Sequence, residues 1–240
     1  MKIKTPSLGI IIPALNEEKS LGIVVQKLID VIQDNNISAK IIIINDGSSD
    51  NTLSVALKLR EQFKDIEVIN NKNSRNIGHC YRQGFERLST DYITWFPADG
   101  EISPSVLKTA YPLLKEDTVI LTHPHSNKYT RPLQRRVLSH IYQRFLNFSL
   151  STNIKYFNGN SFYPRSVFLN YSILSKGFTI NAELIIRAIF QLNYKFVEIP
   201  FTLKQRHSGK SKAISLKQFL NVGLQIFFLI RKKNNLSDEK

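Results

Sequence analysis

The sequence predicts an α/β fold in which helices flank a mostly parallel central sheet, and three observations support this prediction. Short β-branched runs recur through the first half of the chain, and stretches of helical periodicity separate them. Acidic residues follow three of these runs. The 240 residues, 42% of them hydrophobic, suffice for one substantial core. We therefore expect one nucleotide-binding type of α/β sheet, with its ligands at the carboxyl ends of the strands.

The first half contains five expected strands, at 8–12, 40–45, 66–70, 91–96 and 118–122. Apolar residues at helical spacing over 21–32 predict a helix between the first two strands. Ser48 or Ser49 is expected to cap a helix that runs to Phe63, and a third helix spans 77–88. Ser103 and Pro104 together suggest an N-cap followed by proline at the first helical position.

The second half is less regular. We expect a basic amphipathic helix over 133–150, short strands on both sides of 158–160, a helix over 181–191 and a strand over 195–200. Residues 205–212 have the composition of a loop. An apolar helical face follows at 213–230, before a polar tail at 231–240. This helix is too short to span a bilayer, so it is expected to lie on a membrane surface or pack on the domain.

Composition excludes several classes of protein. The single cysteine, Cys80, excludes a disulfide scaffold and a cysteine-based zinc site, and a reducing compartment fits best. The apolar run near the N-terminus contains Pro13 and leads directly into acids, which favours a buried strand over a signal peptide. The sequence contains no run of 18 or more apolar residues, so no segment is expected to span a membrane.

The net charge of +14 is unevenly distributed. Residues 1–103 carry a net charge of −1, residues 104–230 carry +13, and the last ten residues carry +2. Such an asymmetry suggests that the second half meets a polyanion: a nucleic acid, an anionic membrane surface or a phosphorylated substrate. Composition alone leaves all three open.

Acidic residues are paired after three of the expected strands, as Glu17 with Glu18, Asp46 with Asp50, and Asp99 with Glu101. A single acid after a strand is usually a turn or cap residue. Three pairs at one sheet edge would repel each other unless a cation or hydrogen-bond donors offset their charge. Such oxygen ligands suit Mg²⁺ or Mn²⁺ held together with a diphosphate.

Six strings occur in order along the chain: IIPALNEE at 11–18, INDGSSDNT at 44–52, SRNIG at 74–78, PADGE at 97–101, GFTINAELI at 177–185 and EIPFTLKQRHSGKSK at 198–212. They resemble the family-two inverting glycosyltransferases, in particular the branch of dolichyl-phosphate mannose synthase and polyprenyl-phosphate sugar transferases. The resemblance covers nearly the whole chain, from about residue 8 to residue 212. Six motifs in order make it highly specific.

The resemblance implies a GT-A fold, Rossmann-like, over residues 1–212, with a nucleotide-sugar half at 1–103 and an acceptor half at 104–212. Residues at the ends of the first two strands and in the loop after the third would bind the nucleotide. By match of motif, Pro13, Leu15 and Glu17 line the base and ribose pocket, Asp46 contacts the base or ribose, and Arg75, Asn76 and Gly78 lie beside the nucleotide.

The same resemblance assigns the groups that handle phosphate. Asp99 matches the second acid of the DxD element, which holds the metal on the donor diphosphate. Arg131, with Arg135 and Arg136, lies where the branch binds the acceptor phosphate, although any one of these arginines fits a solvated helix face equally well. A basic loop that closes over phosphates is matched by Arg206, Ser208, Lys210 and Lys212. The residues expected to act in catalysis are Asp99, Arg131, Arg206 and Lys210.

One departure from the family pattern concerns the metal site. Pro97 stands at the first DxD position, so one metal carboxylate is missing, and Glu101 follows two residues after Asp99. In an extended segment the spacing of Asp99 and Glu101 would place both side chains on one face, which favours a shifted metal pair. The alternative is that Glu101 merely leads into a helix and that donor binding needs little or no metal.

Three functions remain open. The first is inverting transfer of a hexose from a GDP- or UDP-sugar to a polyprenyl or dolichyl phosphate, by an enzyme peripheral on the cytoplasmic face of the membrane. The second is transfer to a sugar hydroxyl in surface polysaccharide or glycolipid synthesis. The third is a catalytically impaired sugar-nucleotide-binding protein, motivated by Pro97. The expected partners are the nucleotide-sugar, a lipid-linked acceptor, an anionic membrane surface and, as an alternative attachment, a membrane protein. A nucleic acid is not expected.

Overall fold

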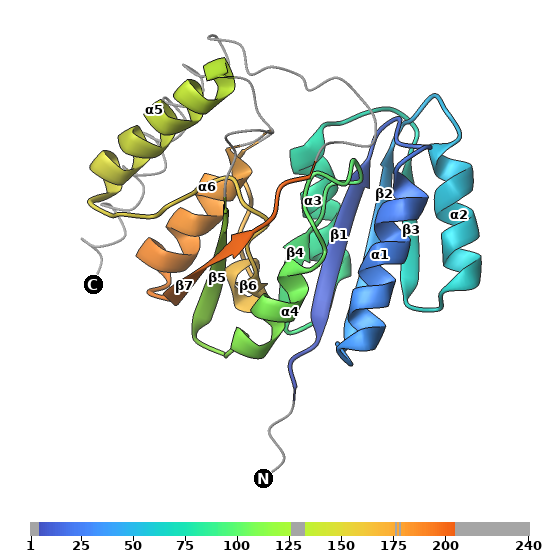
Figure 1. The fold of residues 1–240 in the computed structure, drawn as a ribbon, viewed down its shortest axis with the longest axis horizontal. Coiled ribbons are helices and arrows are strands. Elements are labelled where there is room, and N and C mark those ends of the chain that lie inside the picture. The colour runs from blue at the N-terminus through green and yellow to red at the C-terminus, as the bar shows by residue number, and fades with distance from the viewer. Residues whose placement is uncertain (1–4, 126–132, 176, 178, 205–240) are drawn as a thin grey trace.

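The computed structural model describes residues 5–125, 133–175, 177 and 179–204 (Figure 1). Its main sheet has five strands in the order β3-β2-β1-β4-β6, and a second sheet pairs β5 with β7. Every strand pair is parallel except β4 with β6. The strands are β1 Leu8–Ala14, β2 Ala39–Asp46, β3 Ile66–Asn71, β4 Tyr92–Trp95, β5 Thr118–Pro124, β6 Tyr163–Pro164 and β7 Lys195–Phe201. The expected α/β architecture with a mostly parallel sheet is confirmed.

The helices connect these strands. They are α1 Leu21–Asp34, α2 Thr52–Gln62, α3 Ile77–Arg87, α4 Val106–Ala110, α5 Leu133–Leu150 and α6 Ile180–Ile185. A π-helical turn, Ile186–Gln191, continues α6, and 3₁₀ turns occur at Tyr111–Leu113 and Arg165–Val167. In the described part of the chain, no helix combines the length and the apolar character needed to cross a membrane.

Two hydrophobic clusters cover the two faces of the main sheet. Because successive side chains of a strand point to opposite faces, neighbouring isoleucines of β1 enter different clusters. Ile10 and Ile12 pack with residues of α1, α2 and α4. Ile11 packs on the other face with residues of α3, α5 and α6. The sheet is therefore buried on both sides, as expected for parallel strands.

The strand expected at 118–122 forms, but it does not join the main sheet. β5 pairs with β7 in parallel, with Thr118 opposite Lys195. The free edge of β4 is taken instead by β6, which runs antiparallel to it. Apolar periodicity predicts that a segment is extended, but it does not encode the partner strand. Around 158–160, β6 is the short strand that forms on the C-terminal side.

Both expected serine caps are wrong. Helix α2 begins at Thr52, and its first turn is satisfied by the Asp50 carboxylate, which accepts the Thr52 backbone N–H at 3.0 Å. Ser48 and Ser49 bond across to Asn16 in the neighbouring loop. Helix α4 begins at Val106, two residues after the proline expected at its first position.

Candidate active site

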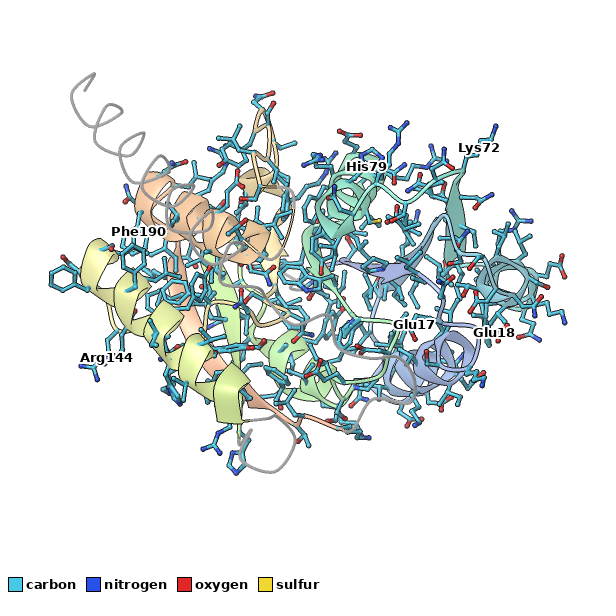
Figure 2. All side chains as sticks on the ribbon, turned by 90° about the horizontal axis from the view of Figure 1, so that it is seen from above. Glu17, Glu18, Lys72, His79, Arg144 and Phe190 are labelled. Carbon is cyan, nitrogen blue, oxygen red and sulfur yellow. The ribbon has the colours of Figure 1, made fainter. Side chains whose placement is uncertain are left out.

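The expected acids gather at the carboxyl edge of the main sheet, at the top of Figure 1. β2, β1 and β4 are neighbours, so the segments that leave their carboxyl ends lie side by side. Asp46 is the last residue of β2, and Asp99 lies in the turn that follows β4. Figure 2 looks down on this edge and places Glu17 and Glu18 just before α1, right of the centre of the view.

Two consecutive residues of α3, Cys80 and Tyr81, have pKa values that are affected by Asp46 and by Asp99. Burial, together with the nearby Asp46 carboxylate, raises the pKa of the Cys80 thiol to about 12. Burial, together with the charges of Cys80 and Asp99, raises the pKa of Tyr81 well above its usual value. The two carboxylates, far apart in the sequence, therefore both lie close to the N-terminal part of α3.

Asp46 binds four hydrogen-bond donors of the loop before α3 and of β3. Its carboxylate accepts the backbone N–H groups of Arg75 at 3.0 Å and Asn76 at 3.1 Å. The Ser74 hydroxyl at 2.8 Å and the Asn71 amide at 3.2 Å complete the set. Burial by itself would raise the pKa of Asp46, but these hydrogen bonds outweigh it and hold the pKa below its ordinary value. Asp46 therefore anchors the loop 74–76 as an ionised group.

The anchored loop contains three residues that were assigned to the nucleotide. Asn76 is the N-cap of α3, with a φ of 81°, and its side chain accepts the His79 backbone N–H at 3.3 Å. Gly78 is buried in the first turn of α3, and the side chain of Arg75 is exposed. The structure thus brings Arg75, Asn76 and Gly78 together beside Asp46, while their contacts with a nucleotide stay a prediction.

The loops after β1 and β2 are bonded to each other through the remaining acids. The Glu17 backbone N–H donates to the Thr52 hydroxyl at 2.8 Å, and the Glu18 carboxylate accepts the backbone N–H of Asn51 at 3.1 Å. Asp50 accepts the Glu18 backbone N–H at 3.2 Å and the Thr52 hydroxyl. Glu18 and Asp50 are therefore structural acids. The Glu17 carboxylate accepts the Ser20 hydroxyl at 2.5 Å, and Glu17, Pro13 and Leu15 are all partly buried; their contacts with a base or ribose stay a prediction.

Asp99 and Glu101 lie in a turn and not in an extended segment, so the expected geometry is wrong. Gly100 has a φ of 74°, and the Asp99 carboxylate accepts the Glu101 backbone N–H at 2.9 Å. Asp99 is 8% exposed, and Glu101 is partly buried. The turn brings the Asp99 carboxylate to the backbone of Glu101, the other residue of the proposed metal pair.

This pair of carboxylates fits a hard divalent cation in its chemistry. Mg²⁺ is commonly held by one or two protein carboxylates, with phosphate and water oxygens as its other ligands. Within the described residues, no cluster of three or more histidine, cysteine or acidic side chains could form a metal site made by the protein alone. Asp99 and Glu101 therefore fit a metal that is shared with a diphosphate better than a closed structural site.

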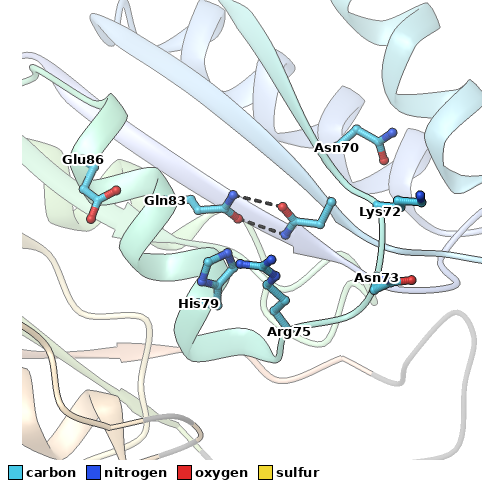
Figure 3. Close-up of a pocket in the computed structure, with 8 residues that line it drawn as sticks. Asn70, Lys72, Asn73, Arg75, His79, Gln83 and Glu86 are labelled. Atoms are coloured by element: carbon cyan, nitrogen blue, oxygen red, sulfur yellow. Dashed lines mark hydrogen bonds between the residues drawn. The ribbon is translucent and has the colours of Figure 1, made fainter.

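A polar pocket of about 510 Å³ lies beside this edge, between β3 and α3 (Figure 3). Asn71 and Gln83 exchange two hydrogen bonds, at 2.9 and 3.0 Å, and Arg75 lies next to His79. Asn71 also donates to Asp46, so the pocket wall and the anchored loop share one hydrogen-bond network. The pocket is adjacent to the expected nucleotide site and is separate from the turn of Asp99.

Most of the expected phosphate-binding residues cannot be placed. Arg131, Arg206, Ser208, Lys210 and Lys212 lie outside the described residues, as do the helix expected at 213–230 and the polar tail. Glu183, from the fifth motif, is fully buried and accepts the Tyr171 hydroxyl and the backbone N–H groups of Leu174 and Ser175. These bonds make Glu183 a structural acid.

One polar residue near the edge was not singled out by sequence reasoning. Asn160 is fully buried, and its side-chain oxygen accepts the Thr122 hydroxyl at 3.1 Å, while its amide nitrogen has no partner among the described residues. Thr94 of β4 donates to the Asn160 carbonyl, which brings the segment 158–160 alongside the strand that leads to Asp99. The polar triplet Asn-Gly-Asn was the only available signal.

Comparisons with known proteins agree with this geometry. The model of the family described as "Glycosyl transferase family 2" matches residues 9–175. The "Dolichyl-phosphate beta-glucosyltransferase ALG5D" of Trichomonas vaginalis is 30% identical over 39% of this chain and 30% of its own length. The "Dolichyl-phosphate beta-glucosyltransferase ALG5A" of the same organism is 24% identical over 55% of this chain and 45% of its own length. The matched region thus spans less than half of each of these relatives.

Solved structures confirm the GT-A fold. The crystal structure of glucosyl-3-phosphoglycerate synthase from Mycobacterium tuberculosis, in complex with Mg²⁺ and uridine diphosphate, has a TM-score of 0.67. The comparison covers 95% of this chain and 79% of that chain, at 14% sequence identity. A second crystal structure of that enzyme, with Mn²⁺, UDP-glucose and phosphoglyceric acid, gives a TM-score of 0.68 over a similar share of both chains. At this identity the likeness concerns the fold alone.

Proposed function

The chain belongs to glycosyltransferase family 2, and on this premise we propose that it transfers a hexose from a nucleotide-sugar to a polyprenyl or dolichyl phosphate, with inversion at the anomeric carbon. The two curated relatives from Trichomonas are named as dolichyl-phosphate β-glucosyltransferases, which supports this acceptor and favours a glucosyl group over a mannosyl group. UDP-glucose is therefore the first donor to test, with GDP-sugars second.

The observation that carries the proposal is the arrangement of carboxylates around the end of β1. Asp46 anchors the loop 74–76 on one side, and the turn of Asp99 and Glu101 lies on the other, because β1 lies between β2 and β4. In this proposal the base and ribose of the donor bind among Pro13, Leu15, Glu17, Asp46, Arg75, Asn76 and Gly78. The diphosphate then reaches across the end of β1 toward Asp99.

Asp99 and Glu101 would hold Mg²⁺ or Mn²⁺ on the donor diphosphate. The metal, when bound, offsets the negative charge that develops on the departing nucleoside diphosphate. The role of this chain is to keep both carboxylates in one turn, which the hydrogen bond from the Glu101 N–H to Asp99 maintains. The basic loop of Arg206, Ser208, Lys210 and Lys212 would add further donors to the phosphates.

The acids of the second half support a phosphate acceptor over a hydroxyl acceptor. A hydroxyl needs a general base, whereas a lipid phosphate is already anionic at neutral pH. Glu183 is held by three hydrogen bonds, and Glu198 accepts the Lys155 backbone N–H at 2.7 Å. Asp117 pairs with Lys195 at 3.2 Å and, like Glu116, lies before the start of β5, at the opposite end from the carboxyl edge. Arg131 is then the proposed ligand of the acceptor phosphate.

The proposed enzyme works at the cytoplasmic face of a membrane, because its acceptor is anchored in a bilayer. The excess of positive charge in residues 104–230 supports such a location, since cytoplasmic leaflets are anionic. The segment 213–230 is a candidate for surface attachment. A membrane protein is proposed as a further partner.

A transfer assay tests the proposal directly. The full chain, Mn²⁺, radiolabelled UDP-glucose or GDP-mannose and polyprenyl phosphate are expected to yield a lipid-linked sugar that mild acid releases. An acid-stable glycoside would indicate a sugar hydroxyl as acceptor instead. The absence of any product with all donors, together with an Asp99→Asn variant that complements a deletion strain fully, would support an impaired sugar-nucleotide-binding protein and overturn the proposal.

A further inference from the structure

Helix α5 exposes a stripe of large apolar side chains. Val137, Ile141, Phe145 and Phe148 are 49%, 50%, 43% and 87% exposed. At 3.6 residues per turn, these four positions fall within about 80° of one side of the helix. Single apolar residues are ordinary on a protein surface, but a contiguous stripe of this kind marks an interaction face.

The opposite side of α5 is already occupied by the core of the protein. Tyr142, Leu146 and Leu150 are buried in the cluster that also contains residues of α3 and α6. Asn147, on the flank, donates to the Ile154 carbonyl at 3.0 Å and accepts its N–H, which fixes the chain after the helix. The exposed stripe is therefore not needed to hold α5 on the domain.

Positive charge accompanies the apolar stripe. Helix α5 contains Arg135, Arg136 and Arg144, and no acid. At helical spacing, Arg144 falls directly beside the stripe, whereas the other two arginines fall on other sides of the helix. Figure 2 shows Arg144 pointing outward from α5, on the opposite side of the molecule from Glu17 and Glu18. A shallow hollow of about 620 Å³, lined by residues that include Arg144, Phe145 and Phe148, adjoins this face.

Charge decides among the occupants that this face could take. Residues 205–212 and 231–240 contain seven lysines and arginines against two acids, so these two segments would meet the basic flank of α5 with charge of the same sign. A second copy of the chain would present the same basic helix. An anionic lipid surface offers both apolar depth and negative charge, the combination to which basic amphipathic helices bind.

We propose that α5 lies in the surface of an anionic bilayer, with Val137, Ile141, Phe145 and Phe148 entering the boundary of the acyl chains and Arg144 contacting lipid phosphates. The N-terminal end of α5 points toward the same end of the molecule as the carboxyl edge of the sheet (Figure 1). The inference rests on the proposed lipid-phosphate acceptor for its purpose. Vesicle binding is measured without donor or acceptor, so its failure would be distinguishable from a failure of the transferase proposal.

Cosedimentation of the full chain with vesicles tests the stripe. Vesicles of equal parts phosphatidylcholine and phosphatidylglycerol are expected to bind the wild-type protein. Phe148→Ser should weaken this partitioning by at least about tenfold, because a phenylalanine side chain leaves the apolar phase. Ile141→Ser should also weaken it, whereas Ile23→Ser, at a position on α1 that is 44% exposed, should not.

A charge variant tests the lipid contact. Arg144→Gln should reduce binding to the phosphatidylglycerol vesicles by about fivefold, and Arg60→Gln, on α2, should leave it unchanged. The proposal is overturned if the wild-type protein does not bind these vesicles, or if Ile141→Ser and Phe148→Ser bind as the wild type does. It is equally overturned if Phe148→Ser converts a dimer to a monomer in sedimentation velocity while vesicle binding persists.

Discussion

The Asp46 carboxylate accepts the backbone N–H of Arg75 at 3.0 Å, across 29 residues of sequence. This bond, with its three companions, attaches the loop before α3 to the carboxyl end of β2. A residue expected to touch the nucleotide thus also holds the loop expected to surround it. The shape of the proposed donor site therefore depends on one ionised side chain.

Replacement of Asp46 by asparagine should destabilise the protein by roughly 2–4 kcal/mol. The NH₂ group of the new side chain would face N–H and O–H groups that are themselves donors, so buried hydrogen bonds would be lost. UDP should bind at least about tenfold more weakly as the loop 74–76 loses its anchor. Urea unfolding and calorimetry measure the two effects. Asp65→Asn, at an exposed aspartate before β3, is the matched control and should change neither.

The stability contributed by Asp46 should depend on pH with a defined sign. Its folded-state pKa lies below the ordinary value of 3.8, so its contribution is fully present above that value and is lost as the pH falls through the lower, folded-state pKa. The difference in unfolding free energy between the wild type and Asp46→Asn should thus be constant at neutral pH and shrink below about pH 4. A difference that stays constant at acid pH would contradict this role.

Two glycine substitutions should act in opposite directions. Gly47 has a φ of +73°, and an added Cβ would lie 2.6 Å from the Ser74 nitrogen, so Gly47→Ala should cost about 1–3 kcal/mol. In α1, a Cβ on Gly22 would come no closer than 3.7 Å to Val55, and Gly22→Ala should stabilise by about 0.5 kcal/mol. Thermal unfolding measures both effects. If the two variants changed the unfolding temperature equally, the backbone at Gly47 and its approach to Ser74 would impose no strain on an alanine.

Glu101→Gln tests whether the acid pair has moved along the chain to Asp99 and Glu101. In the presence of UDP, the variant should bind Mn²⁺ at least about tenfold more weakly, because one of two carboxylates is lost. Electron paramagnetic resonance of free Mn²⁺ gives the affinity without an activity assay. Glu61→Gln on α2 serves as the control. Unchanged Mn²⁺ affinity would indicate that Glu101 only leads into the following helix.

Cys80 should resist alkylation in the folded protein. Its pKa is raised from about 9 to about 12 by burial and by the Asp46 carboxylate, so at pH 8 its thiolate is about a thousandfold scarcer than that of an ordinary cysteine. Mass spectrometry after iodoacetamide treatment should show modification only in denaturant. Rapid labelling of the native protein would mean that α3 opens readily beside Asp46.

Much of this molecule follows from local patterns in the sequence. Short continuous apolar runs predicted the strands, because a strand of a parallel sheet is buried on both faces. Apolar residues at helical spacing predicted most of the helices. The six motifs identified the family that the comparisons confirm. The positions of Asp46 and Asp99 at strand ends also predicted that both would meet at one edge, because parallel neighbours end together.

The roles of individual acids were decided by the tertiary structure. Nothing in the sequence distinguished Glu18 and Asp50 from the other acids after the strands, yet both bond between the loops after β1 and β2. The Glu18 carboxylate accepts the Asn51 N–H, and Asp50 accepts the Glu18 N–H. The pairing of β5 with β7, and the side of α5 that stays uncovered, were likewise outside the reach of periodicity. A pattern states which residues share a face, whereas the partner of that face depends on chain segments that are distant in sequence and meet only in the folded protein.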